Sequence, residues 1–144
     1  MNPVLEITRL VRDRCLCLHV HRAARALARR FDDALRPIGL THGQFSLMMS
    51  LNRPKPASMA AVASLLAMDR TTLTAALKPL RRRGLVKVAP DPADRRGRLM
   101  TLTARGRTLL IRAVPVWKKT HAAVEALLRD GESDRLRTNL RALS

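Results

Sequence analysis

The spacing of apolar residues changes at Gly84, and this change limits the fold more than any other feature of the sequence. Before Gly84, apolar residues recur every three or four positions, as they do along one face of an amphipathic helix. After it, two short segments with β-strand character, 85–88 and 99–102, flank a polar stretch rich in turn residues, 89–98. We therefore expect a mainly α-helical chain with one small β-hairpin that carries a long basic tip.

Helices before the hairpin are marked by apolar spacing and by their starting residues. The spacing from Leu10 onward predicts one long helix, which ends near Arg36 because Pro37 disfavours helical geometry in the residue before it. Further helices are expected to start at capping side chains, with these starts and approximate ends: Thr41, Ser58–Ala67 and Asp69–Arg83.

Two helices are expected after the hairpin. Thr103 can cap a long helix whose apolar residues keep the same spacing as far as Leu128. The polar stretch 130–133 interrupts it, and a last short helix carries Leu136, Leu140 and Leu143. A single short helix of the same chain cannot bury all three of these leucines. We therefore expect them to join the first helix in a two-fold dimer interface.

The charge of the chain points to a polyanionic partner. The sequence has 28 Lys and Arg against 11 Asp and Glu, a formal net charge of +17, and these basic residues lie between apolar positions. A folded domain with a basic surface is therefore expected, and such a surface attracts nucleic acid. Aromatic residues make up only 2% of the chain, so it has almost nothing on which to stack unpaired bases. Duplex DNA is the better partner.

Several other classes of protein are disfavoured. The chain has neither an apolar run of membrane-spanning length nor the apolar segment of a secretory signal near its start. Cys15 and Cys17 point to different faces of a helix, so neither a disulfide nor a chelate is expected from them, and free thiols suit the cytoplasm. No nucleophile–base pair or phosphate-binding glycine loop is present, and Cys17 with His21, one helical turn apart, gives only two metal ligands, which do not make a site. We therefore expect no enzyme, cofactor or metal.

The order helix, tight turn, helix, hairpin is that of a winged helix-turn-helix. In this motif the second helix enters the major groove, and its first residues face the base edges. The helix that begins at Asp69 offers an arginine that can read guanine, threonines that can contact bases or phosphates, and a lysine suited to phosphates. The expected DNA contacts on this helix are Arg70, Thr71, Thr72, Thr74 and Lys78.

The hairpin tip gathers three arginines, Arg95, Arg96 and Arg98, around one glycine. Arginine inserts well into a narrow minor groove, where the negative potential is enhanced. Asp94 stands beside them and is expected to orient one arginine through a charge-assisted hydrogen bond. The tip is therefore predicted to contact DNA, whereas the arginines along the first helix form either a solvated face or a phosphate track.

Three segments in this order resemble the MarR family of bacterial transcription regulators. Residues 62–74 resemble the family's helix-turn-helix, 80–86 its helix-to-wing junction, and 91–106 its wing and the entry to the next helix. By this resemblance, Arg96 matches the wing arginine that enters the minor groove and Asp94 the acid near it. The resemblance implies one domain, 1–144, with a winged helix-turn-helix at about 41–103 and a dimerisation region formed by about 1–36 and 104–144.

The resemblance also implies a two-fold dimer on a pseudo-palindromic operator, acting as a repressor that a ligand or an oxidant releases. Cys17 resembles in position the reactive cysteine of the family's organic-hydroperoxide-sensing branch, although the supporting tyrosines are missing. Cys17 is therefore either a sensor or a buried apolar residue. The candidate sensing site comprises Cys17, His21, His42 and Phe45, with a small-molecule inducer as the alternative signal.

The leading prediction is thus a cytoplasmic, sequence-specific, dimeric regulator that binds double-stranded DNA. The competing hypothesis is a basic architectural protein that coats DNA without sequence preference. Architectural binding needs only charge, whereas the capped, threonine-rich start of the helix after Asp69 suits the reading of bases.

Overall fold

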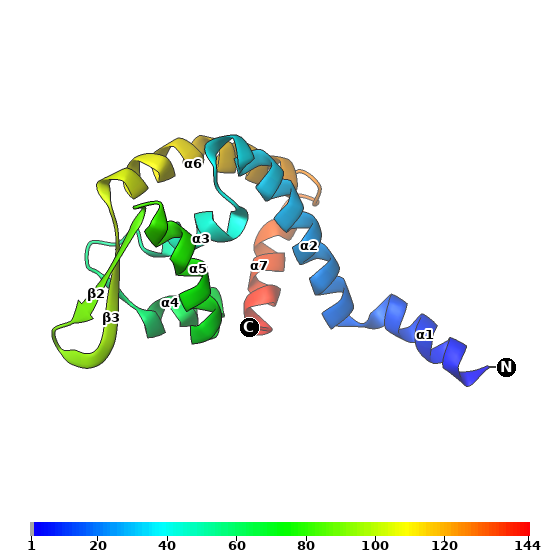
Figure 1. The fold of residues 1–144 in the computed structure, drawn as a ribbon. Coiled ribbons are helices and arrows are strands. Elements are labelled where there is room, and N and C mark those ends of the chain that lie inside the picture. The colour runs from blue at the N-terminus through cyan, green and yellow to red at the C-terminus, as the bar shows by residue number, and fades with distance from the viewer. Residues whose placement is uncertain (1) are drawn as a thin grey trace.

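The computed structural model describes residues 2–144, and it is mainly helical with a small antiparallel sheet, as predicted. The elements in chain order are α1 (Pro3–Arg14), α2 (Leu16–Leu35), η1 (Arg36–Ile38), α3 (His42–Ser50), β1 (Ala57–Ser58), α4 (Met59–Leu66), α5 (Arg70–Arg82), β2 (Val86–Asp91), β3 (Asp94–Leu102), α6 (Ala104–Glu125) and α7 (Glu132–Ala142). Helix α6 crosses above α3, α5 and the hairpin, α2 packs against α6 and slopes down beside them, and α1 extends away from the rest of the molecule (Figure 1).

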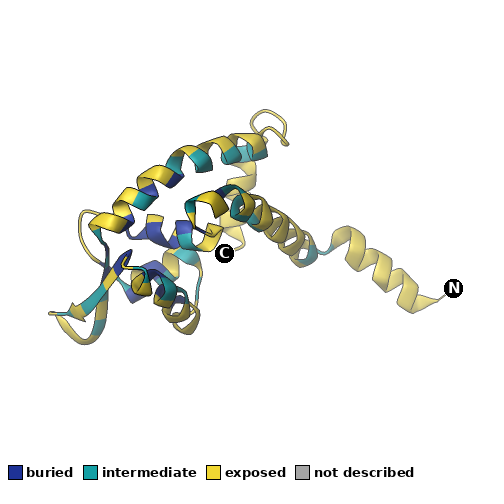
Figure 2. Cartoon of the chain, turned by 45° about the horizontal axis from the view of Figure 1, so that its top comes forward, coloured by how far each residue is buried: buried dark blue, intermediate teal, exposed yellow. Residues whose placement is uncertain are grey.

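The hydrophobic core lies below α6, where α3, α4, α5 and the sheet meet. Its completely buried side chains come from every one of these elements and include Met48, Val62, Leu73, Leu80 and Met100. In Figure 2 the buried residues gather in this part of the molecule, whereas α1 is exposed along its whole length. No residue of α1 or α7 is buried within one chain. The core therefore holds the central helices and the hairpin together and leaves both terminal helices outside it.

The four capping residues begin helices as predicted. Thr41 forms a capping box with Gln44, in which each side chain accepts a hydrogen bond from the other residue's backbone N–H. Side-chain oxygens of the other three caps accept from backbone N–H groups one turn into the helix, at 2.7 to 3.2 Å: Ser58, Asp69 and Thr103.

The prediction of one long helix from Leu10 to Arg36 is wrong, because the chain breaks at Cys15. Cys15 has extended backbone angles, φ −70° and ψ 109°, and its Sγ accepts from the N–H of Leu18 at 3.5 Å as the cap of α2. The sequence does not show this break, because the helical spacing of apolar residues continues on both sides of Cys15. A single extended residue changes the direction of the chain without changing the residue types around it. The chain therefore starts with two helices in place of one.

The hairpin is longer and its tip shorter than predicted. Strands β2 and β3 pair as far as Asp91 and Asp94, so only Pro92 and Ala93 connect them, and most of the expected loop 89–98 is strand. A third strand, β1, pairs with the outer side of β3 and was not predicted. Strand β1 was missed because two residues are too few to show the alternation of polar and apolar residues that marks a strand. The strands β2 and β3 were predicted too short because their outer parts project into solvent and carry polar residues on both faces.

The start of α6 is locked against the junction between α5 and β2. The Thr103 hydroxyl donates to the carbonyl oxygen of Gly84 at 2.7 Å, and the Thr103 N–H donates to that of Leu85 at 3.1 Å. One turn later, Gly106 lies so close to Leu85 that a Cβ atom there would stand 2.1 Å from the Leu85 carbonyl oxygen. Helix α5, the hairpin and α6 therefore share one rigid joint.

No helix within residues 2–144 is both long and apolar enough to span a membrane.

Candidate nucleic-acid interface

A tight turn places α5 across α4. Helix α4 ends at Leu66, and Ala67 adopts the left-handed conformation, φ 51° and ψ 43°, while its N–H and that of Met68 return to carbonyls of α4. Ala67 is the one residue other than glycine with a positive φ in the described chain, 2–144. Asp69 then caps α5. Three leucines, Leu73, Leu77 and Leu80, turn one face of α5 into the core, so the opposite face is presented to solvent.

All five residues predicted to contact DNA from this helix lie on its exposed side. The structure also shows that two of the threonine hydroxyls have partners within the chain. The Thr72 hydroxyl donates to the Asp69 carboxylate at 2.7 Å, and the Thr74 hydroxyl donates to the Arg70 carbonyl oxygen at 2.8 Å. Hydrogen bonds from the backbone N–H and then the hydroxyl of Thr72 lower the pKa of Asp69, so this cap stays ionised in mildly acidic solution.

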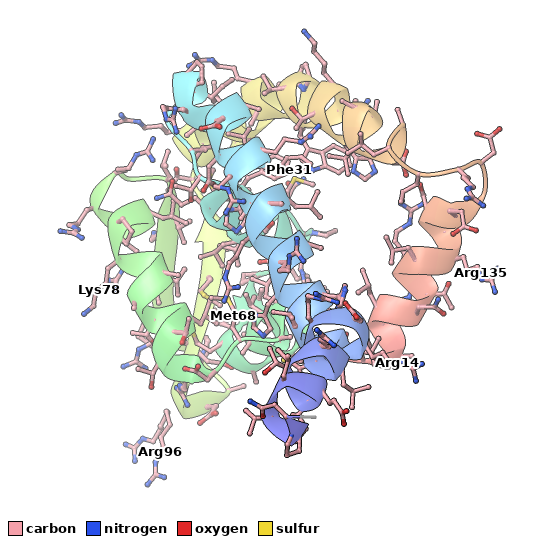
Figure 3. All side chains as sticks on the ribbon, turned by 90° about the vertical axis from the view of Figure 1, so that its right-hand side faces the viewer. Arg14, Phe31, Met68, Lys78, Arg96 and Arg135 are labelled. Carbon is pink, nitrogen blue, oxygen red and sulfur yellow. The ribbon has the colours of Figure 1, made fainter. Side chains whose placement is uncertain are left out.

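The arginines of the hairpin tip are all exposed. Figure 3 shows the Arg96 side chain pointing away from the body of the protein, on the same side as Lys78 of α5 and opposite Arg135 of α7. The prediction that Asp94 orients an arginine side chain is wrong in its detail. The Asp94 carboxylate accepts from the backbone N–H of Arg96 at 3.0 Å, and it makes no ion pair within the described residues. It shapes the backbone of the tip and leaves the guanidinium groups for another partner.

Close packing also fixes the tip. A Cβ atom on Gly97 would stand 3.0 Å from the Cβ of Asp91 and 3.2 Å from that of Asp94, so the two aspartates converge over the glycine. The Asp91 carboxylate accepts from the N–H of Ala93 at 2.9 Å. Both aspartates are thus bound to backbone N–H groups, and the turn is held in one shape before any DNA arrives.

A basic groove of about 280 Å³ runs between α5 and the hairpin. Its charged lining is entirely basic and consists of Arg70, Lys78, Arg81 and Arg98, with Thr74 and apolar residues between them. A second hollow of about 330 Å³ continues toward the tip and joins Arg70 to Arg96 and Arg98, with Asp91 and Asp94 also in its wall. Base-reading and wing residues predicted from separate parts of the sequence therefore form one continuous surface. A concave surface with clustered guanidinium groups attracts phosphate.

The four residues of the candidate sensing site do not come together within one chain. His42 and Phe45 line a cavity of about 300 Å³ with α2 and Trp117, but Cys17 and His21 do not line it. Cys17 is exposed, and it lies seven residues before the nearest α2 residue of the cavity, Ala24, or about 10 Å along the helix. Cys17 is thus not buried within a single chain, and its burial in a dimer interface remains a prediction.

His42 has its own partner instead. Its backbone N–H and its ring Nδ1 both lie within hydrogen-bond distance of one Asp32 oxygen, at 2.7 and 2.8 Å. The bond from the His42 backbone, followed by that from its ring, lowers the pKa of Asp32. This pair ties the end of α2 to the start of α3.

A larger cavity, of about 560 Å³, was not predicted. It lies between α3, α4 and α6 and is mostly apolar, with Lys118 as its one charged residue and Phe45 and Trp117 in its wall. The two rings stack at 6.2 Å between centroids. The spacing of Trp117 along its helix indicates only an inward-facing residue, because helical period cannot distinguish a packed core from a cavity wall.

Comparisons with known proteins agree with this geometry. The sequence profile of the MarR family matches residues 40–97, from the start of α3 to the hairpin tip. The transcriptional repressor NicR of Pseudomonas putida is 32% identical over 93 residues, which are 65% of this chain and 59% of NicR. The matched stretch thus spans little more than half the length of that curated relative.

Solved structures match nearly the whole chain. The transcriptional regulator MosR of M. tuberculosis, in complex with DNA, is 40% identical, with 90% of this chain and 92% of MosR covered and a TM-score of 0.81. BpsR of Bordetella bronchiseptica, whose DNA binding is regulated by 6-hydroxynicotinic acid, is 28% identical, with 89% and 97% covered and a TM-score of 0.78. The resemblance seen in the sequence is confirmed over the central motif and both flanking helical regions. The chain belongs to the MarR family.

Proposed function

We propose that this protein is a sequence-specific, dimeric transcription regulator that binds double-stranded operator DNA and acts in the cytoplasm. The observation that carries this function is the continuous basic surface formed by α5 and the hairpin, on which no acidic side chain lines the central groove. MosR, a structural relative solved in complex with DNA, supports the same partner.

The surface divides into three kinds of contact. Arg70 and Thr71 at the start of α5 are suited to base edges, and Lys78 and Arg81, which line the basic groove, are suited to phosphates. Arg96 extends from the tip toward the minor groove beside the half-site. Together these contacts combine sequence reading with a large electrostatic contribution.

The architectural alternative is tested by measuring affinity for two DNAs. Duplexes are selected from a random pool by the full-length protein, and binding of the selected duplex is compared with that of a scrambled duplex of equal length at fixed salt. A regulator should prefer the selected sequence by about 10³-fold or more. Equal affinity for both duplexes would establish the architectural function instead.

The dimer is proposed to form through residues 1–36 and 104–144, leaving 41–103 to bind DNA. Leu136 and Leu140 of α7 and its C-terminal cap Leu143 are 44%, 41% and 62% exposed in the single chain, and α1 has an apolar face that nothing in the chain covers. A helix of 12 residues is only marginally stable alone in water, so α1 also needs a partner.

Sedimentation at micromolar concentration without DNA is therefore expected to give twice the 16.1 kDa mass of the chain. The double variant Leu136→Asp, Leu140→Asp places charges in the proposed interface and should sediment as a monomer. Thr138→Asp puts one charge on the opposite face of α7 and should leave the dimer intact. A wild-type monomer would remove the basis for a two-fold operator complex.

We further propose that the regulator acts as a repressor and that a small organic anion releases it. NicR is named a repressor, and BpsR responds to an aromatic acid. In this chain the cavities that meet at Phe45 and Trp117 offer apolar walls, with Lys118 beside them. One cavity lies between α3, α4 and α6 and the other between α2, α3 and α6. A ligand there can favour one arrangement of the proposed dimerisation region relative to the proposed DNA-binding region over another.

Trp117 is the only tryptophan of the chain, so its fluorescence reports on this site. We expect 6-hydroxynicotinate or benzoate to change that fluorescence and to weaken binding of the selected duplex by about tenfold. Cys17→Ser should respond to the acids as the wild type does. If cumene hydroperoxide releases the wild type but not Cys17→Ser, and the acids have no effect, the signal is an oxidant sensed at Cys17.

A further inference from the structure

Arg83, at the C-terminal end of α5, differs from the arginines beside it. Arg81 and Arg82 are exposed, whereas Arg83 is half-buried. Its guanidinium turns back into the protein, and Nη1 donates to the carbonyl oxygen of Gly39 at 2.7 Å across 44 residues of sequence. Among the side-chain hydrogen bonds of residues 2–144, this is the one that joins α5 or its cap Arg83 to the segment between α2 and α3.

The Gly39 carbonyl is a fixed acceptor. Gly39 has φ +78°, and its N–H donates to the Arg36 carbonyl oxygen at 2.9 Å to close η1. Leu35 and Leu40, on either side of this turn, are 0% and 3% exposed and anchor it in the core. A Cβ atom on Gly39 would stand 3.3 Å from Nη2 of Arg83, so the guanidinium packs against a position that has no room to spare.

The same turn is bound to α2 and α3 on its other side. Asp32, in the last turn of α2, accepts both hydrogen bonds from His42 at the start of α3. Helix α5 itself packs mainly against α4 and β2. The Arg83–Gly39 bond therefore connects the end of α5 to the turn that directly follows α2, the last helix of the proposed dimerisation region before α3.

We propose that Arg83 is a positioning residue, which sets the direction of α5 relative to α2 without contacting DNA itself. This role rests on the proposed function, because it acts on operator binding. In a dimer the two recognition helices must stand about 34 Å apart to enter successive major grooves. Helix α5 has 13 residues and is about 20 Å long, so a tilt of about 5° at Arg83 moves the base-reading end by roughly 2 Å. Hydrogen bonds to bases do not survive such a shift.

The competing role for Arg83 is an ordinary phosphate contact, and two variants separate the roles. Arg83→Lys keeps the positive charge that a phosphate needs, but its side chain is one bond shorter and lacks the planar fork. Gly39→Ala changes no charge and crowds the same bond from the other end. Arg82→Lys is the matched control for the first. Gly131→Ala is the control for the second, because Gly131 has φ +77° but open space around it.

Each variant is measured as the full-length dimer with the selected and the scrambled duplex over a range of salt concentrations. We expect Arg83→Lys and Gly39→Ala each to weaken binding of the selected duplex by about tenfold. Affinity for the scrambled duplex should be unchanged, and so should the salt slope, which is the slope of log affinity against log salt concentration. The combined variant should be little weaker than either single variant, since both remove one bond. The two controls should bind as the wild type does.

Two results would overturn the positioning role. One is wild-type affinity of Arg83→Lys for the selected duplex. The other is an Arg83→Ala variant that loses affinity for both duplexes equally and lowers the salt slope by about 1, as a lost phosphate contact does. Thermal unfolding of each variant identifies any that fails to fold, and Arg83→Lys remains decisive if Gly39→Ala does. A wild type that selects no duplex contradicts the proposed function instead.

Discussion

Gly106→Ala is expected to destabilise the protein more than alanine at any other glycine position. The new Cβ atom would stand 2.1 Å from the carbonyl oxygen of Leu85, 3.1 Å from its carbonyl carbon and 3.4 Å from Cδ2 of Leu102. Both Leu85 atoms belong to the backbone, whose N–H and carbonyl groups already bond to α5 and to Thr103, so neither can turn aside as a side chain does. We expect a loss of about 3 kcal/mol or more in the free energy of unfolding.

Urea unfolding measures this loss, and Gly43→Ala is its control. Gly43 lies in the first turn of α3 with no atom within 4 Å of its missing Cβ, so alanine there should be neutral or stabilising by up to about 1 kcal/mol. A small domain has only about 5–15 kcal/mol of stability, and Gly106→Ala should therefore unfold at markedly lower urea. Equal midpoints for the two variants would mean that α6 is not locked at this joint.

Loss of Arg70 and loss of Arg96 should affect DNA binding in different ways. Arg70→Ala removes an arginine at the start of α5, and its cost of about 1–3 kcal/mol should fall on particular base pairs inside the half-sites. Arg96→Ala removes the arginine that points out from the wing. Its cost should depend on A·T-rich sequence outside the half-sites, because a narrow minor groove attracts arginine most strongly.

Affinities for a set of single-base-pair variants of the selected duplex distinguish the two patterns. In both proteins the salt slope should remain steep, since many other basic residues still release counterions from phosphates. Arg135→Ala lies on the opposite side of the molecule and serves as the control for general loss of charge. If both alanine variants weakened every duplex by the same factor, neither arginine would read sequence.

The helix starts could be predicted from the sequence because capping is local. Thr41, Ser58, Asp69 and Thr103 each bond to an N–H three residues away, so the residue type and its neighbours contain the whole interaction. The order of helix, turn, helix and hairpin followed from these starts. The exposed position of the predicted DNA-contact residues followed as well, since the three leucines of α5 determine which face is buried.

Features that depend on distant parts of the chain could not be predicted in this way. The bond from Arg83 to Gly39 and the close approach of Gly106 to Leu85 join segments whose meeting is decided by the packed core. The partner of Asp94 was missed for a different reason. The sequence places arginines and a backbone N–H within equal reach of the carboxylate, and only the turn geometry selects the N–H. The break at Cys15 is marked by neither proline nor glycine.

The hydroxyls of Thr72 and Thr74 in α5 point to acceptors within the chain, and their direction has a consequence for the bases that they can read. A hydroxyl has one proton, and Thr72 and Thr74 both give theirs to acceptors within the chain. Each oxygen therefore offers only lone pairs to an incoming groove. It can accept from the amino groups of adenine or cytosine, but it has nothing to donate to guanine O6, thymine O4 or a phosphate oxygen. The internal bonds thus give these two side chains the polarity of acceptors before the protein meets its operator.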